Sequence, residues 1–305
     1  MPGLPKTPND VLRLADWLEL QSLTSDDGSA SHGDLQAALS QGSILEPNAP
    51  HEPDAFQAVE SLVLAVFDEL EQRSRAGQEG YPFSIDLPRI VAPDNWQRTR
   101  SSYIYCLSLS YYGPRQATPD GRQQRRTFEY LAVHAAKRYL PGEAIRFASP
   151  RNPTDLPTSF SEAVNELCRT HLLEGAGYRS QPTLSAKDKA LDVVAWRHAH
   201  DRLPGKLILF ANCASGRDWE SKVDALQPNN FWGDWMAEAA VSQIVKAIFI
   251  PHRVDRKYWD KRSRAAGIIF DRCRIAALVP SVPRSSQFTG GWPWAISVIQ
   301  NQQEH

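Results

Sequence analysis

Two short apolar runs, separated by a polar turn, constrain the fold of this 305-residue chain more than any other feature. Residues 191–196 and 206–211 are rich in aliphatic and aromatic side chains, and each run has the length of a buried strand. Pro204 and Gly205 lie between them, in a segment typical of a turn. The pattern therefore predicts two neighbouring strands in the interior of a sheet.

Polar side chains mark one end of this predicted strand pair. Asp192 opens the first run, and the second run stops at Asn212 and Cys213. Alternate residues of a strand share a face, so Asn212 is expected to point the same way as Phe210 and position 214. A carboxylate at the end of a buried strand needs a partner, and we therefore interpret Asp192 as a functional residue.

The surrounding pattern predicts an α/β domain with a mixed sheet and helices on both faces. The expected order is α-β-β-β-α-β-α-β. Expected helices cover residues 128–139, 159–173, 218–226 and 255–266, and further strands are expected at the GYRSQP segment (177–182), at 244–250 and at 267–270.

The part of the chain before this domain predicts helices at residues 11–20 and 56–70, and an aromatic helix or strand at 96–113. A segment rich in Gly, Pro and charge, GPRQATPDGRQQRR, indicates a boundary. We therefore expect an N-terminal helical domain over 1–115 and the α/β domain over 116–280. Residues 281–305 are expected to form a loose C-terminal extension, with Trp292 and Trp294 folded back.

Charge and cysteine content narrow the class of protein. Lys and Arg total 34 against 35 Asp and Glu, so a surface for nucleic acid would have to be a local patch. We see no signal peptide and no apolar stretch of membrane-spanning length, and thus expect no membrane partner. The four cysteines show no zinc-site spacing, and a reduced cytoplasmic location is expected.

Several segments resemble the PD-(D/E)xK superfamily of restriction-endonuclease-like nucleases, and most closely its Mrr-like branch. In that superfamily a helix carries a glutamate, a Gly-Tyr strand follows, an aspartate opens the next strand, and a further strand ends in QxK or ExK. The matching segments are FSEAVNEL with Glu162 and Glu166, GAGYR with Tyr178, ALDVVAW with Asp192, and LILFANC with Asn212. Glu129 in TFEYLAV is a rival for the helical glutamate, because a Phe-Glu pair that opens a helix is also typical of the family.

The resemblance implies an αβββαβ core and metal-dependent cleavage of DNA, in a bacterial genome-defence setting. Mg²⁺ or Mn²⁺ would be the cofactor, since such ions bind carboxylate oxygens and activate water. Asp192 would be the main metal ligand, and Glu162 or Glu166 a second acid. Asp188 is a further candidate ligand, although an acid between two lysines is typical of a solvated turn.

The chain departs from the family pattern at position 214, where alanine stands in place of the expected lysine. A cation must then come from another element to stabilise the charge that develops on the phosphate. Lys222 and Arg217, which follow the second run, are the candidates. Migration of the lysine to the following helix is compatible with activity in this superfamily.

Two other functions remain open from the sequence. The chain could be a catalytically inactive nuclease-fold subunit that binds DNA or acts as a scaffold with other defence-system subunits, and a homodimer is also considered. Its phosphate contacts would then come from the basic segments 122–126 and 252–264. Alternatively Cys213, a nucleophile between a strand and a helix, could serve a Cys/Ser hydrolase. His198 and His200 are the histidines nearest to Cys213 in sequence, and nothing marks an acid for them.

Overall fold

The computed structural model describes residues 4, 10–41, 53–114, 119–180 and 190–301, and divides the chain into two compact units. Unit 1 comprises residues 1–113 and 272–305, and unit 2 comprises residues 114–271. The chain leaves unit 1 after Gly113 and returns to it at Arg272. These limits differ from the sequence-based ones, which extended the second domain to residue 280 and set 281–305 apart.

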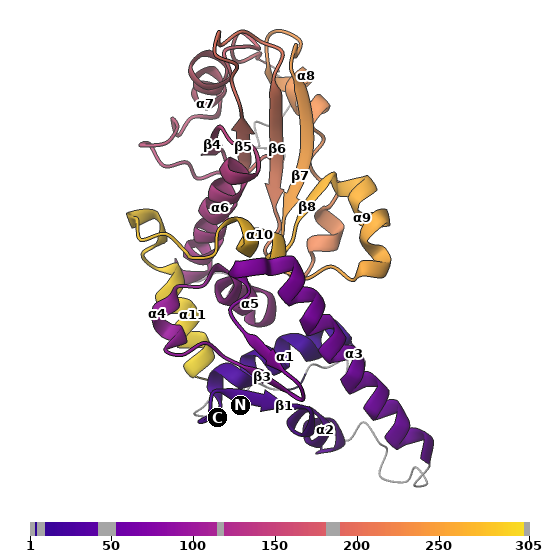
Figure 1. The fold of residues 1–305 in the computed structure, drawn as a ribbon. Coiled ribbons are helices and arrows are strands. Elements are labelled where there is room, and N and C mark those ends of the chain that lie inside the picture. The colour runs from indigo at the N-terminus through magenta and orange to yellow at the C-terminus, as the bar shows by residue number, and fades with distance from the viewer. Residues whose placement is uncertain (1–3, 5–9, 42–52, 115–118, 181–189, 302–305) are drawn as a thin grey trace. The chain divides into compact units, whose positions relative to one another are not determined.

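Unit 1 is mainly helical (Figure 1). Its elements before residue 114 are α1 (Val11–Thr24), β1 (Ser29–Ser31), α2 (His32–Gln41), α3 (Pro53–Gly77), η1 (Gln78–Gly80), β2 (Ser84–Asp86), β3 (Arg89–Val91), α4 (Trp96–Thr99) and α5 (Ser102–Tyr112). The three strands form an antiparallel sheet in the order β1-β3-β2. After unit 2 the chain adds α10 (Arg272–Leu278), η5 (Ser286–Phe288) and α11 (Gly291–Gln300).

The C-terminal segment is more ordered than the sequence indicated. Residues 291–300 form α11 rather than a loose extension. The expectation that its tryptophans fold back is confirmed, because Trp292 is buried and its Nε1 donates to Gln97 O at 2.8 Å. The Trp294 ring centroid lies 6.1 Å from that of Tyr105. The Gly, Pro and Ser residues before α11 are not typical of a helix, so the sequence did not predict α11. The apolar residues of α11 pack on α5.

A buried charge network joins the helices of unit 1. Arg73 on α3 donates to Asp16 Oδ1 at 2.8 Å and to Glu19 Oε2 at 2.9 Å, and Arg272 on α10 donates to the same Asp16 oxygen at 2.5 Å. The hydroxyl of Tyr103 donates to Glu19 Oε1 at 2.7 Å. Arg73, Glu19 and Arg272 are fully buried, so each charge depends on its partners for solvation.

Unit 2 is an α/β domain built on one five-stranded mixed sheet, which confirms the expected fold class. Its strands lie in the order β4-β5-β6-β7-β8; β4, β5 and β6 pair antiparallel, whereas β6, β7 and β8 pair parallel (Figure 1). The elements are α6 (Pro119–Tyr139), β4 (Glu143–Arg146), α7 (Phe160–Glu166), η2 (Leu167–Leu172), β5 (Val193–Trp196), β6 (Leu207–Cys213), η3 (Trp219–Lys222), α8 (Pro228–Trp235), β7 (Gln243–Phe249), η4 (Arg256–Tyr258), α9 (Trp259–Ala266) and β8 (Ile268–Phe270).

The first strand of this sheet is not the one that the sequence indicated. The expected strand at GYRSQP is absent from its described part, residues 177–180, where Tyr178 makes only an isolated bridge to Met236. Instead β4 pairs with β5, in the register Arg146↔Val193 to Glu143↔Trp196. As a result α6, and not α7, is the helix that directly precedes the first strand. The expected helix at 218–226 is also shorter, and only η3 forms there.

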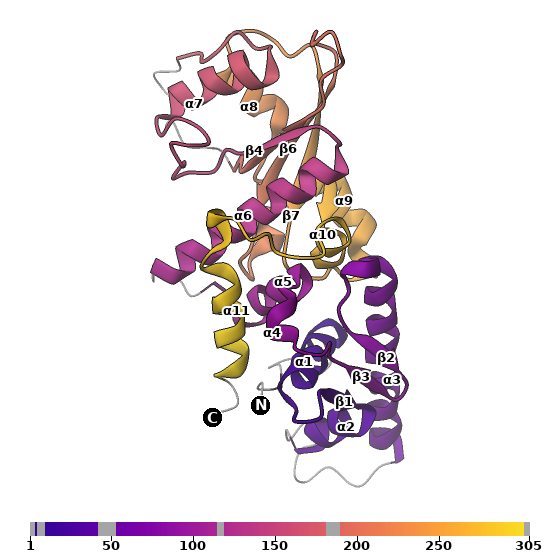
Figure 2. The ribbon, with the colours of Figure 1, turned by 60° about the vertical axis from the view of Figure 1, so that its left-hand side comes forward.

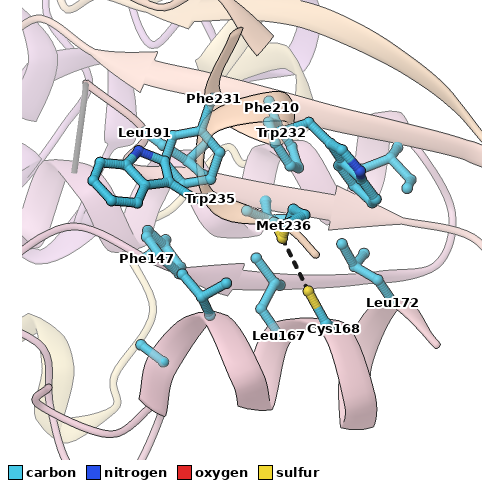
Figure 3. Close-up of a cluster of buried hydrophobic side chains, with 14 of the residues drawn as sticks. Phe147, Leu167, Cys168, Leu172, Leu191, Phe210, Phe231, Trp232, Trp235 and Met236 are labelled. Atoms are coloured by element: carbon cyan, nitrogen blue, oxygen red, sulfur yellow. Dashed lines mark hydrogen bonds between the residues drawn. The ribbon is translucent and has the colours of Figure 1, made fainter. Parts of the chain in front are cut away.

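Two faces of the sheet are covered by different helices. Val194 and Trp196 of β5 point, with Ile208 and Phe210 of β6, into a cluster formed by α7, η2 and α8. Figure 3 shows Trp232, Trp235 and Met236 of the α8 region meeting Leu167, Cys168 and Leu172 of η2 there. Trp232 and Trp235 thus pack against this face of the sheet. The helix α6 lies along β4 and β5 (Figure 2), where the alternate residues Val193 and Ala195 are buried.

The helices in the described part of the chain are all too short or too polar to cross a membrane.

Candidate functional site

The backbone of Asp192 is held at the point where three strands of unit 2 meet. Its N–H donates to Ala211 O of β6 at 2.9 Å. Its carbonyl accepts hydrogen bonds from the N–H groups of Phe147, at 2.7 Å, and Ala148, at 3.2 Å, just after β4. The pairing of β5 with both neighbours therefore fixes the residue directly before the strand begins.

The carboxylate of Asp192 turns toward the end of β6. Its Oδ2 accepts a hydrogen bond from the N–H of Cys213 at 2.7 Å, and the residue is half-buried. A carboxylate has about four acceptor sites, so Asp192 can accept more than this one hydrogen bond. The expected meeting of Asp192 with the polar end of the next strand is present, through the backbone of Cys213.

The side chain of Asn212 connects the end of β6 to η3. Asn212 is buried, and its Nδ2 donates to Lys222 O at 3.3 Å. This bond ties Lys222 to the same end of the hairpin, although Lys222 follows Asn212 by ten residues. The structure therefore brings together two of the residues that the sequence singled out.

The ammonium group of Lys222 forms an exposed ion pair. Its Nζ lies 3.1 Å from Asp218 Oδ2, and the side chains of Lys222 and Asp218 are 44% and 63% exposed. The hydrogen bond and the charge of Lys222 lower the pKa of Asp218 below its ordinary value. An exposed pair of this kind is weak, so Lys222 can exchange Asp218 for another anion at little cost. Arg217 is exposed in the turn before η3.

Glu129 on α6 is engaged by an arginine that the sequence reasoning missed. Arg146, the last residue of β4, places its Nη2 and Nε 2.6 Å from Glu129 Oε2, and both side chains are largely buried. Burial raises the pKa of Glu129, and the charge of Arg146 opposes the rise. Arg146 also donates from Nη1 to Pro150 O at 3.0 Å. The one signal in the sequence was an arginine within a short segment, EAIR, whose strand pattern was too weak to predict.

Cys213 lies close enough to Glu129 and Arg146 for their charges to affect the pKa of its thiol. The pKa of its thiol is raised well above the ordinary value, first by burial and then by the charges of Asp192 and Glu129, whereas Arg146 lowers it. The thiol therefore stays protonated near neutral pH, which is unfavourable for a nucleophile. His198 follows β5, so it lies at the opposite end of that strand from Asp192. These two features weigh against a hydrolase that uses Cys213.

The two glutamates of α7 differ in their surroundings. Glu162 is exposed in the first turn of the helix. Glu166 raises the pKa of His171, although burial, the larger effect, leaves that pKa below its ordinary value. The ring of His171 lies 5.4 Å from that of Trp196, the last residue of β5, so Glu166 belongs to the opposite end of the strand from Asp192. Asp188 lies outside the described residues.

The donor set fits only a metal ion that takes few protein ligands. Among the described residues, no group of three or more His, Cys, Asp or Glu side chains could hold a metal. Mg²⁺ is commonly held by one or two carboxylates and completes its shell with water and phosphate oxygens of the substrate. Asp192 fits the carboxylate of such a site, and the amide oxygen of Asn212 is a neutral oxygen ligand at the same end of the hairpin.

Comparison with protein-family models, with curated proteins and with solved structures finds no match to this chain.

Proposed function

We propose that this protein is a metal-dependent DNA endonuclease. The observation that carries the proposal is the convergence of Asp192, Asn212 and Lys222 at one end of the β5–β6 hairpin. The order α6, β4, β5, β6, α8 and β7 agrees with the αβββαβ core that the resemblance to PD-(D/E)xK nucleases implies. The genome-defence setting depends on that resemblance alone.

Each residue has a role that follows from its position. Asp192, with the amide oxygen of Asn212, would hold Mg²⁺ or Mn²⁺, which when bound polarises the phosphate and lowers the pKa of a water molecule. The N–H of Cys213 orients the carboxylate of Asp192. Lys222 stabilises the negative charge that develops on the phosphate, in place of the lysine missing at position 214.

Glu129 contributes through Arg146 rather than as a direct ligand. Because Arg146 donates two hydrogen-bonding groups to it, Glu129 has no need of a second cation for charge balance. We assign the pair the task of supporting the strand end that carries Asp192. Glu162 and Glu166 have no role in this proposal, because Glu162 is exposed and Glu166 lies toward the opposite end of β5.

The test is plasmid cleavage in Mg²⁺, in Mn²⁺ and in chelator. We expect the wild-type protein to cleave only with metal, and Asp192→Asn to abolish cleavage while still accepting the hydrogen bond from Cys213. Lys222→Ala should slow cleavage by about 100- to 1000-fold, as expected for loss of one charge-stabilising donor.

Asp201→Ala is the matched control, because Asp201 is an exposed acid in the turn at the other end of the same hairpin. It should cleave like the wild type. Circular dichroism checks that each variant is folded. Full activity of Asp192→Asn, or cleavage by the wild type in chelator, would contradict the proposal.

A second candidate is a DNA-binding subunit of the same fold without catalysis. Two observations favour this candidate. The ion pair with Arg146 removes Glu129 from the acids that could bind a metal, and Ala214 stands in place of the expected lysine. This candidate predicts DNA binding that is unchanged by chelator and no cleavage with either metal. The same plasmid assay, run beside a binding assay, separates the two.

A further inference from the structure

The first half of α6 carries a stripe of arginines that leads toward the candidate site. Arg122, Arg125 and Arg126 precede Glu129 on the helix, and the spacings of three and four residues between them put all four side chains on one face. At 1.5 Å of rise per residue, the stripe from Arg122 to Arg126 is about 6 Å long. Glu129, one turn further along α6, pairs with Arg146 beside the start of β5.

These arginines are available to a ligand. Arg122 and Arg125 are exposed, Arg126 is half-buried, and none of the three forms an ion pair within the described part of the chain. The opposite face of α6 supplies the packing, through buried residues that include Phe128 and Leu131. Within unit 2, Arg126 and Arg125 act on Glu129 through their charge, which lowers its pKa less than Arg146 does.

A second element brings positive charge to the same place. Lys222 on η3 pairs with Asp218 at 3.1 Å. The charge of Arg125 also makes the smallest contribution to the lowered pKa of Asp218, so Arg125 lies within electrostatic range of the turn before η3, and α6 packs along β4, β5 and β6. Cations from α6 and from η3 thus flank the end of the hairpin that carries Asp192.

We propose that Arg122, Arg125 and Arg126 bind successive phosphates of one DNA strand and lead that strand to Asp192 and Lys222. The inference rests on the proposed function, and it assigns the path of the substrate. Phosphates of one strand are spaced about 3.4 Å apart along the duplex axis, so three successive phosphates extend over about 7 Å, which matches the rise of about 6 Å from Arg122 to Arg126. With a net charge of −1, the whole chain offers no general attraction for DNA, which makes a local stripe necessary.

The experiment measures the affinity of Asp192→Asn for a short fluorescent DNA duplex in chelator, over a series of salt concentrations. In that background we expect Arg125→Glu with Arg126→Glu to weaken binding at least about tenfold at low salt. The slope of log affinity against log salt should fall by about two, because each phosphate contact contributes about 0.9 to it.

Arg197→Glu with Arg202→Glu is the matched control. It changes the net charge equally in the turn between β5 and β6, where both residues are exposed at the end of the hairpin away from Asp192. We expect it to alter affinity by less than about twofold. Equal losses in the two double variants, or no loss in the stripe variant, would overturn the inference. Should circular dichroism show that the charge reversal unfolds unit 2, Arg125→Gln with Arg126→Gln replaces it, with the same criteria.

Two further arms separate this inference from its premise. A matching RNA duplex is titrated in parallel, and a loss confined to RNA would overturn DNA as the ligand. Wild-type protein that binds DNA through the stripe but cleaves none with Mg²⁺ or Mn²⁺ would remove the endonuclease proposal and leave the stripe in place. If Arg125→Glu with Arg126→Glu, made in the otherwise wild-type chain, still cleaves DNA and binds it with unchanged affinity, the stripe inference is overturned and the endonuclease proposal stands.

Discussion

At the scale of single residues, an arginine determines what Glu129 can do. A carboxylate next to a buried guanidinium 2.6 Å away is already neutralised, and releasing it would leave Arg146 uncompensated in the interior. Asp192 accepts a hydrogen bond from a neutral backbone N–H, that of Cys213, at 2.7 Å. The two acids near the same thiol therefore differ in one of their contacts, which is a guanidinium for Glu129 and a backbone amide for Asp192.

The protonated state of Cys213 leads to a test of the hydrolase alternative. Because the pKa of its thiol is well above the ordinary value, Cys213 should react with iodoacetamide more slowly than free cysteine at pH 8. Cys213→Ser should keep metal-dependent cleavage, because the backbone N–H that binds Asp192 remains. The measurements are alkylation followed by mass spectrometry and plasmid cleavage. Complete loss of cleavage in Cys213→Ser would instead make the thiol a participant.

The candidate site could be predicted in part from the sequence. Asp192, Asn212 and Lys222 were accessible because apolar runs reveal where buried strands begin and end, and polar residues at those ends stand out. Arg146 was not accessible, because its role depends on a salt bridge across seventeen residues of chain that no local pattern indicates. The position of Glu166 relative to Asp192 could not be predicted either, since helical spacing gives no information on which end of the sheet a helix meets.

At the scale of elements, the edge strand β4 was harder to predict from the sequence than the central strands of the sheet. Its sequence, EAIR, has polar residues at both ends and only four positions. The strand is stabilised by pairing with β5 rather than by its own propensity. Strands β5, β6 and β7, by contrast, are mainly apolar, and the sequence predicted all three close to their observed bounds. Buried strands could be predicted because burial requires an apolar run in the sequence. An edge strand that depends on pairing with its neighbour leaves no such run.

The connection from α9 to β8 depends on a glycine. Gly267 has φ +73° and ψ −131°, a region that is essentially restricted to glycine, and an added Cβ would lie 2.2 Å from Lys246 O. We expect Gly267→Ala to destabilise unit 2 by at least about 2 kcal/mol. Gly233 is the control, since it is exposed in α8 and a Cβ there meets nothing within 4 Å.

Gly233→Ala should therefore be neutral or stabilise the helix by up to about 1 kcal/mol. Urea unfolding of both variants, followed by circular dichroism, makes the comparison. If the two substitutions had equal effects, the backbone at Gly267 would not be the constraint that we infer.

At the scale of the whole molecule, the buried charge network joins parts of the chain that are far apart in sequence. Burial raises the pKa of Asp16, but the charges of Arg272 and Arg73 outweigh it and lower the pKa to about 2, from an ordinary value of 3.8. The lowered pKa means that Asp16 stabilises unit 1 fully above about pH 4, and that this contribution is lost as pH falls toward 2. Arg272 is thus a link between the C-terminal segment and α1.

Arg272→Met tests that link. We expect it to lower the free energy of unfolding at neutral pH by about 3–5 kcal/mol, because it leaves Asp16 and Glu19 short of a buried cation. Arg75→Ala is the control, since Arg75 forms an exposed pair with Glu71 and should cost less than about 1 kcal/mol. Chemical unfolding measures both. A loss below about 1 kcal/mol in Arg272→Met would show that α10 is held by apolar packing alone.

The return of the chain to unit 1 at Arg272 has a consequence for its synthesis. A ribosome releases all of unit 2 before it releases α10 and α11. The α/β domain can therefore complete its sheet before α10 and α11 are available to pack with the earlier helices of unit 1, α1 and α3 among them. Asp16 and Glu19 gain their second arginine only after all of unit 2 has been synthesised. A premature stop after residue 271 would therefore yield a finished sheet attached to a helical region that lacks one of its cations.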